Sequence, residues 1–182
     1  MNNASNKNVL ILNLTSDDEN KLRDRKERFT DYFISIGANK VDFIEIDTSK
    51  EEFVTKFEEA GLLYVPGGDT IILIRYIKEM NLLSHIKSFK GVYLGNSAGA
   101  YAMCPDYLRI GHGPIEIIPS FGLVNFWVKA HYKPEFESDL NELSKNREIF
   151  ALEDESALIF DGSKEFLGTV WKFSQGKKEK VN

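Results

Sequence analysis

Residues 92–100, Val-Tyr-Leu-Gly-Asn-Ser-Ala-Gly-Ala, carry the chain from a short apolar run directly into a serine between two glycines. An apolar run of this kind is typical of a strand buried on both faces of a parallel sheet. A serine at the tight turn from such a strand into a helix fits a nucleophile elbow, where Gly95 and Gly99 let strand and helix approach closely. We therefore predict that Ser97 is a nucleophile. The alternative is that Ser97 only caps the helix that follows.

The chain before this turn alternates short apolar runs with helical patterns. The expected strands are 9–14, 41–46, 62–65 and 92–94, and the expected helices are 17–36, 49–61 and 70 to about 78. In the first helix an apolar face is expected from Leu22, Phe29, Tyr32, Phe33 and Ile36. Ser49 and Glu52 are spaced as a capping box, and Gly37 stands where a left-handed C-cap belongs. This alternation predicts an α/β fold with a doubly wound, mostly parallel sheet, whose reactive groups gather at the carboxyl ends of the strands.

The second half of the chain has a different pattern. Short β-like runs at 115–118, 126–130, 149–152, 157–160 and 166–173 surround one polar helical segment at 135–145. We expect this half to extend the sheet and to add antiparallel strands. The length and composition predict one domain over residues 1–182, with flexible tails at 1–7 and 175–182.

Composition excludes several classes of protein. The net charge is −5, and no Lys/Arg cluster is interleaved with aromatic residues, so the electrostatic footprint of a nucleic-acid binder is missing. The single cysteine, Cys104, rules out an internal disulfide and is expected to be a buried apolar residue. The polar N-terminus and the lack of a long apolar run predict a cytoplasmic protein without membrane contact. We expect no metal and no cofactor, and the sequence leaves a homodimer open.

A nucleophilic serine requires a base, and the chain has three histidines. His85 falls in a helical stretch beside leucine and isoleucine, which is an ordinary place for a histidine. His112 falls in a glycine-rich loop, and His131 follows the apolar run 126–130. Because a triad histidine usually stands at a strand end, His131 is preferred and His112 is kept as the alternative.

The remaining parts of such a site are an acid and donors for an oxyanion. Glu153, Asp154 and Glu155 follow the apolar run 149–152, and the residues themselves leave open which of them orients the histidine. The alternative is a charged turn between strands. A backbone N–H of the Gly67–Gly68 turn, together with the N–H of Ala98, could form a two-donor oxyanion hole, while Asp69 caps the next helix.

Four stretches taken together resemble the dipeptidase E (aspartyl dipeptidase) family of serine peptidases, which includes the cyanophycinases. They are 64–70 (Tyr-Val-Pro-Gly-Gly-Asp-Thr), 91–100 around Ser97, 122–123 (Gly-Leu) and 130–132 (Ala-His-Tyr). The resemblance implies a three-layer, flavodoxin-like fold similar to the class I glutamine amidotransferases. It also implies Ser97 as nucleophile, His131 as base, Asp154 as acid, an oxyanion hole from Gly68 and Ala98, and small peptides as substrates.

The sequence departs from that family at three places. The chain starts with what corresponds to the family's second strand, and His112 stands in a loop where aspartyl dipeptidases carry an acid. The segment between His131 and Asp154 is shorter and lacks a counterpart of the arginine that selects an N-terminal aspartate. These departures do not favour aspartate specificity, and they motivate the alternative of a non-catalytic relative that binds or assembles. An α/β-hydrolase esterase fits poorly, since there the acid precedes the histidine in the chain.

Overall fold

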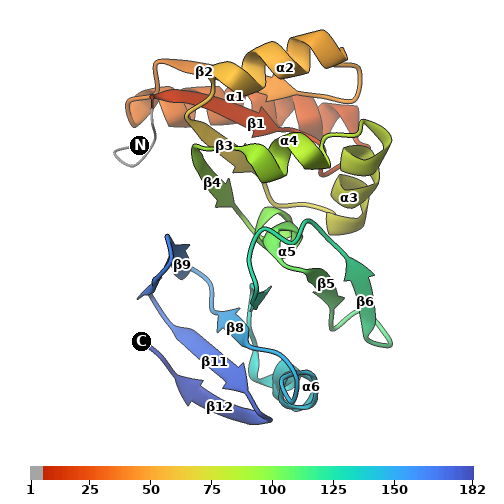
Figure 1. The fold of residues 1–182 in the computed structure, drawn as a ribbon, viewed down its shortest axis with the longest axis vertical. Coiled ribbons are helices and arrows are strands. Elements are labelled where there is room, and N and C mark those ends of the chain that lie inside the picture. The colour runs from red at the N-terminus through yellow and green to blue at the C-terminus, as the bar shows by residue number, and fades with distance from the viewer. Residues whose placement is uncertain (1–5) are drawn as a thin grey trace. The chain divides into compact units, whose positions relative to one another are not determined.

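The first half of the chain is built on four parallel strands, shown in Figure 1 in the computed structural model, which describes residues 6–182. The strands are β1 (Asn8–Leu12), β2 (Lys40–Ile44), β3 (Leu62–Val65) and β4 (Val92–Gly95), in the spatial order β2-β1-β3-β4. The helices are α1 (Glu19–Ser35), α2 (Lys50–Glu59), α3 (Thr70–Glu79), α4 (Leu83–Ser88) and α5 (Ala98–Met103). Because the chain places β2 on one side of β1 and later strands on the other, the predicted doubly wound topology is confirmed.

By backbone contacts the chain forms two units, the N-terminal unit up to Ala100 and the C-terminal unit Tyr101–Asn182. The organisation as one domain stays a prediction. Most of the tail expected at 1–7 lies outside the described residues.

Polar side chains cap the N-termini of α1, α2 and α3, whereas α4 has no side-chain cap. Asp18 accepts hydrogen bonds from the N–H groups of Asn20 and Lys21 at the start of α1, and Asp69 does the same for two N–H groups of α3. Ser49 Oγ accepts from the N–H of Glu52 at 3.1 Å, as the capping pattern predicts. These caps satisfy backbone donors that a helix otherwise leaves without an internal partner.

The core of the N-terminal unit lies on both faces of the sheet. On one face Val9 and Ile11 of β1 cluster with Phe33 of α1. Leu10 and Leu12 point to the opposite face because successive side chains of a strand alternate, and neither has exposed surface. Both faces are therefore covered, as in a three-layer α/β fold. Tyr32 and Ile36, expected on the apolar face of α1, are instead exposed.

The strands of the C-terminal unit pair only with one another among the described residues, instead of extending the first sheet. One sheet has the order β12-β11-β8-β7, with β7 (Trp127–Lys129) parallel to β8 (Ile149–Leu152) and the others antiparallel. Two hairpins accompany it, β5 (Asp106–Arg109) with β6 (Glu116–Pro119) and β9 (Ala157–Phe160) with β10 (Lys164–Leu167). The predicted polar helical segment is a 3₁₀ turn (Pro134–Phe136) followed by α6 (Glu137–Leu143).

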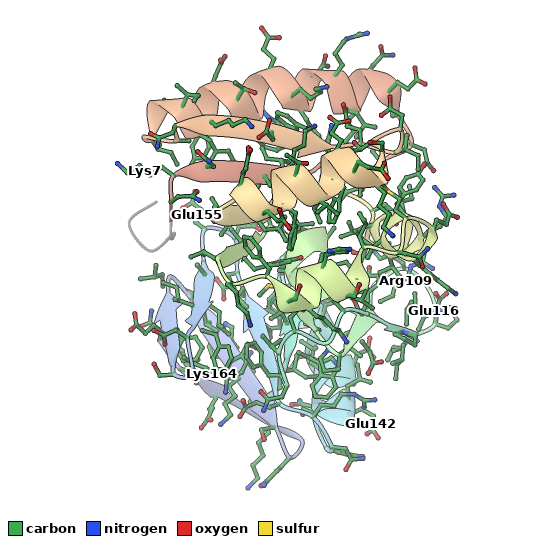
Figure 2. The ribbon with its side chains drawn as sticks, turned by 45° about the horizontal axis from the view of Figure 1, so that its top comes forward. Lys7, Arg109, Glu116, Glu142, Glu155 and Lys164 are labelled. Atoms are coloured by element: carbon green, nitrogen blue, oxygen red, sulfur yellow. The ribbon has the colours of Figure 1, made fainter. Side chains whose placement is uncertain are left out.

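Three features of this unit differ from the expected strand pattern. The run 166–173 is interrupted at Gly168, whose φ is +72°, so that β10 ends before β11 (Val170–Ser174) begins. β12 (Lys177–Lys180) lies where a flexible tail was expected, because Gln175 and Gly176 both have positive φ and form a two-residue hairpin turn. β5 was not anticipated; its Arg109 pairs with Glu116 of β6 at 3.1 Å (Figure 2).

The core of the C-terminal unit uses both faces of its larger sheet. Ile149 and Ala151 of β8 pack with Phe173 and with Leu140 of α6. Phe150 and Leu152, which alternate with them, pack on the other face with Val170 and the β9–β10 hairpin. In the part of the chain that the structure describes, none of the helices is long and apolar enough to span a membrane.

Candidate active site

The turn after β4 holds Ser97 in an unusual backbone conformation. Its φ is +46°, which is uncommon for a residue other than glycine, and its side chain is only partly buried. The two flanking glycines are required sterically. A Cβ on Gly95 would lie 2.5 Å from the carbonyl carbon of Gly99, and one on Gly99 would collide with the carbonyl oxygen of Val65. The close approach of strand and helix predicted from the two glycines is therefore present. The expectation of a buried strand before the turn is wrong, because β4 is the last strand in the order of its sheet and Leu94 is 46% exposed.

The turn after β3 lies next to Ser97. The register pairs Val65 with Gly95, so Gly67 and Ser97 each follow the end of a neighbouring parallel strand by two residues. A Cβ on Gly67 would be 3.5 Å from the Cβ of Ser97, which is ordinary contact distance. The structure thus brings the predicted Gly67–Gly68 turn and the predicted nucleophile together at the carboxyl edge of the sheet.

Thr15 and Arg25 hold the Gly67–Gly68 turn in place through hydrogen bonds. Thr15 Oγ1 donates to the carbonyl oxygen of Gly67 at 2.9 Å, and its own carbonyl accepts from the N–H of Asp69 at 2.9 Å. Arg25, which is 6% exposed, donates from Nη2 to the same Gly67 oxygen and from Nη1 to Thr15 Oγ1, both at 2.8 Å. Thr15 follows β1 and Gly67 follows β3, so these contacts lie at the point where the strand order reverses, the usual ligand crevice of such sheets.

The side chains of Tyr64 and Asn96 connect the serine turn to β3. Their side chains are hydrogen-bonded to each other, and burial raises the pKa of the Tyr64 hydroxyl. Asn96 Oδ1 would lie 3.5 Å from a Cβ on Gly67. Asn96, the residue before Ser97, is therefore hydrogen-bonded to β3 and lies next to the glycine turn.

The C-terminal unit brings together His131 and Asp154. Nδ1 of His131 lies 2.6 Å from Oδ1 of Asp154. The parallel pair β7 and β8, with Lys129 opposite Ala151, ends at one edge, and His131 and Asp154 each follow the end of their strand by two residues. His131 has a φ of +54°, and the N–H of the next residue, Tyr132, donates to Leu152 at 2.9 Å. The imidazole is thus held where strand-end residues meet.

The other two acids of that turn are placed differently. Glu153 Oε1 accepts a hydrogen bond from the indole N–H of Trp171 at 2.8 Å, and Glu155 is exposed with a φ of +63°. Of the three candidates, the structure puts Asp154 against the histidine, a choice the residues alone left open.

The remaining candidates from the sequence lie elsewhere. His112 is in an exposed loop between β5 and β6. His85 packs edge-on against Phe53, with ring centroids 5.2 Å apart, as expected for an ordinary helical histidine. Cys104 is buried, and burial raises its thiol pKa to about 12, which confirms its expected role as an apolar residue. No group of three His, Cys, Asp or Glu side chains that could hold a metal ion occurs within residues 6–182.

A hollow of about 330 Å³ on the N-terminal unit has a charged lining and lacks Ser97 and the glycine turn among its lining residues. Within it Lys26 pairs with Glu45 at 2.6 Å, and Lys56 pairs with Glu52 at 2.5 Å. The lining also holds Asp42 and Asp47, so the hollow has the character of a solvated charged groove with an excess of carboxylates.

Arg25 is the residue of the site that sequence reasoning missed. It stands in a strongly charged stretch of α1, where charged residues are usually solvated, and the sequence analysis did not single it out. The signal lay in its spacing, since Arg25 is three residues after Leu22 and four before Phe29, on the helix stripe that faces the core. An arginine at a core position of an amphipathic helix indicates a specific buried acceptor.

The chain is similar in sequence to known peptidases. The model of "Peptidase family S51" matches residues 6–167. A curated Drosophila melanogaster protein named "Probable alpha-aspartyl dipeptidase" is 35% identical over 81 residues, which are 41% of this chain and 34% of that protein. The match therefore spans about a third of that relative's length.

Two solved structures are similar over nearly the whole chain. A putative peptidase E protein from Listeria monocytogenes EGD-e matches with a TM-score of 0.68 at 19% identity. The match covers 100% of this chain and 90% of the Listeria chain. A peptidase from an acI-B1 Actinobacterium matches with a TM-score of 0.77 at 19% identity. This match covers 96% of this chain and 80% of the actinobacterial chain. At these identities the likeness concerns the fold, and it confirms the α/β fold class predicted from the sequence.

Proposed function

Because the chain belongs to peptidase family S51, we propose that it is a serine peptidase that hydrolyses short peptides through Ser97, His131 and Asp154. The membership bears out the resemblance found in the sequence. The proposal names the reaction class, the three residues and their roles.

One observation carries the assignment of roles, namely the 2.6 Å contact between His131 Nδ1 and Asp154 Oδ1. An ionised carboxylate at this distance fixes Nδ1 as the protonated nitrogen, so that the lone pair of the imidazole resides on Nε2. An imidazole in this tautomer is prepared to accept a proton from a hydroxyl. The contact supplies the pairing of base and acid that the proposed mechanism requires.

In the proposed reaction Ser97 Oγ attacks the carbonyl carbon of the peptide bond while His131 Nε2 accepts the hydroxyl proton. The resulting tetrahedral oxyanion accepts hydrogen bonds from the N–H groups of Gly68 and Ala98. His131 then gives its proton to the leaving amine, and a water molecule activated by the same imidazole hydrolyses the acyl enzyme. Asp154 stabilises the imidazolium that exists between these proton transfers.

The positive φ of Ser97 supports its role as a nucleophile. A side chain on a strained turn between strand and helix projects away from the sheet edge, which is the purpose of a nucleophile elbow. A serine that served only as a helix cap would have the extended backbone of ordinary N-cap residues. The value of +46° therefore favours the nucleophile over the cap.

The proposed substrates are short peptides without a requirement for an N-terminal aspartate. The curated relative is named as an alpha-aspartyl dipeptidase, but the one arginine of the segment 131–154, Arg147, packs over the Trp127 ring, 5.4 Å from its centroid. A cytoplasmic location stays a prediction from the sequence.

A peptide-library cleavage assay with purified protein beside its Ser97→Ala variant tests the proposal. We expect cleavage of dipeptides and short peptides by the wild type and loss of cleavage, by a factor of about 10⁶, in the variant. The position of the scissile bonds would give the specificity in the same measurement. Intact peptides after incubation with the wild type, or equal cleavage by both proteins, would favour the non-catalytic relative.

A further inference from the structure

Arg25 concentrates its hydrogen bonds on a single backbone carbonyl. Its Nη2 donates to the Gly67 oxygen at 2.8 Å, and its Nη1 donates to Thr15 Oγ1, which itself donates to the same oxygen at 2.9 Å. The carbonyl of Gly67 thus accepts from a cation and from a hydroxyl that the cation orients. The two donors occupy both lone pairs that a carbonyl oxygen offers.

Burying this guanidinium is costly, which makes a purely space-filling role a poor explanation. Arg25 is 6% exposed, and burial lowers its pKa, although an arginine remains protonated in proteins. Among the described residues no carboxylate forms an ion pair with it. A buried charge without an opposite charge is retained at a cost in stability, so its position calls for another reason.

The planarity of the peptide links that carbonyl to the proposed oxyanion donor. In a trans peptide the C=O of Gly67 and the N–H of Gly68 point in opposite directions, so fixing one fixes the other. Only glycine fits at position 68, because its φ is +148° and an added Cβ would collide with the carbonyl oxygen of Thr15. The N–H of Gly68 therefore has a single direction, away from Arg25, and the peptide adjoins Ser97.

We propose that Arg25 is a positioning residue for catalysis, which holds and polarises the Gly67–Gly68 peptide so that its N–H stabilises the oxyanion. The inference rests on the proposed function, since it concerns the oxyanion hole of that reaction. A cation on the carbonyl draws electron density through the peptide and makes the N–H a stronger donor. Arg25 acts through the peptide and does not touch the substrate.

This role predicts a specific pattern in the kinetics. The oxyanion exists only after attack by the serine, so a misaligned donor weakens binding of the transition state more than binding of the substrate. For Arg25→Gln we expect kcat to fall by about 10- to 100-fold while KM stays near that of the wild type. Affinity for a peptide aldehyde, which forms a tetrahedral adduct with the serine, should fall by the same factor as kcat/KM.

The experiment measures kcat, KM and the inhibition constant of a peptide aldehyde for wild type, Arg25→Gln and Arg23→Gln. Arg23 is the matched control, because it lies on the same helix, is exposed and donates to Asn20 on the surface. We expect wild-type values for the control. Thermal unfolding of each protein establishes that it is folded. If Arg25→Gln does not fold, Thr15→Val removes the second donor to the same carbonyl and should give a smaller loss in kcat.

The outcomes separate this inference from the proposed function. No cleavage by the wild type would overturn both. Cleavage by the wild type that depends on Ser97, together with an unchanged kcat in folded Arg25→Gln, would overturn the role of Arg25 alone. A rise in KM with unchanged kcat, or unchanged affinity for the aldehyde, would also contradict it, since either result places Arg25 in substrate binding or in structure only.

Discussion

The two units of the chain contain different residues of the proposed triad and oxyanion hole, and each unit holds its residues in a different way. In both, the residues follow neighbouring parallel strands by two positions, Gly67 and Ser97 after β3 and β4, and His131 and Asp154 after β7 and β8. The N-terminal half is fixed by glycines without room for a Cβ and by a buried arginine. The C-terminal half is an exposed pair, with 58% and 79% of the side-chain surface accessible.

This difference follows from what each half must do. A nucleophile and backbone donors have to meet a developing charge at a fixed position, and rigid packing supplies that without reorganisation during the reaction. A base must instead accept and release a proton, and one hydrogen bond to a carboxylate is sufficient to set its tautomer.

The largest effect is expected from removing the charge of the exposed pair. Asp154→Asn keeps the shape of the side chain but favours the wrong tautomer of His131, so we expect kcat to fall by about 10³- to 10⁴-fold. Steady-state kinetics with the best peptide from the library measure it. Glu155→Gln, in the same turn, is the matched control and should retain the kcat of the wild type. Equal losses in both variants would mean that the turn acts by its overall charge and not through Asp154.

A smaller effect, on stability, is expected from filling the crowded turn. Gly99→Ala puts a methyl group against Val65 and should lower the free energy of unfolding by about 1–3 kcal/mol in urea titrations. Gly67→Ala is the comparison, because its Cβ would have contacts no closer than 3.5 Å. We expect its stability within about 1 kcal/mol of the wild type. If Gly99→Ala were as stable as the wild type, the crowding at the serine turn would not be a constraint.

The smallest effect is expected at the cap beside the glycine turn. Asp69 Oδ1 accepts from the N–H groups of Ile71 and Ile72 at 2.7 and 3.1 Å. Asp69→Ala should therefore cost about 1 kcal/mol of unfolding free energy, and Asp69→Ser, which keeps an acceptor, should cost less. Circular dichroism during thermal unfolding gives both values. An alanine variant as stable as the serine variant would show that the cap does not hold this turn.

The sequence predicts the N-terminal unit more fully than the C-terminal one. Its strands are continuous apolar runs, and its turns are marked by glycines and capping residues such as Ser49 and Asp69, so local chemistry determines them. In the C-terminal unit β12 was missed because Lys177–Lys180 has the composition of a chain end, and only the turn at Gln175 and Gly176 makes it a strand. β5 was missed because its strand pairing with β6, and not its composition, defines it.

Within the candidate site, too, the residues of the N-terminal unit were easier to predict than those of the C-terminal unit, with the exception of Arg25. Ser97 and the glycine turn could be predicted from motifs, because a tight turn restricts which residues fit. The partner of His131 could not be chosen from the residues alone, since three neighbouring acids differ only in the direction the turn gives each. The spacing of Arg25 places it on the core-facing stripe of α1, but its acceptor, the Gly67 carbonyl, is distant in sequence and could not be identified from that pattern.

The central claim is that Ser97 of one unit and His131 of the other act on the same proton. Labelling by a fluorophosphonate, which reacts only with an activated serine, tests this directly when its rate is measured for wild type, Ser97→Ala, His131→Ala and His112→Ala. We predict labelling of the wild type and of His112→Ala, none of Ser97→Ala, and a rate for His131→Ala lower by about 10²- to 10⁴-fold. Labelling of His131→Ala at the rate of the wild type would contradict the account.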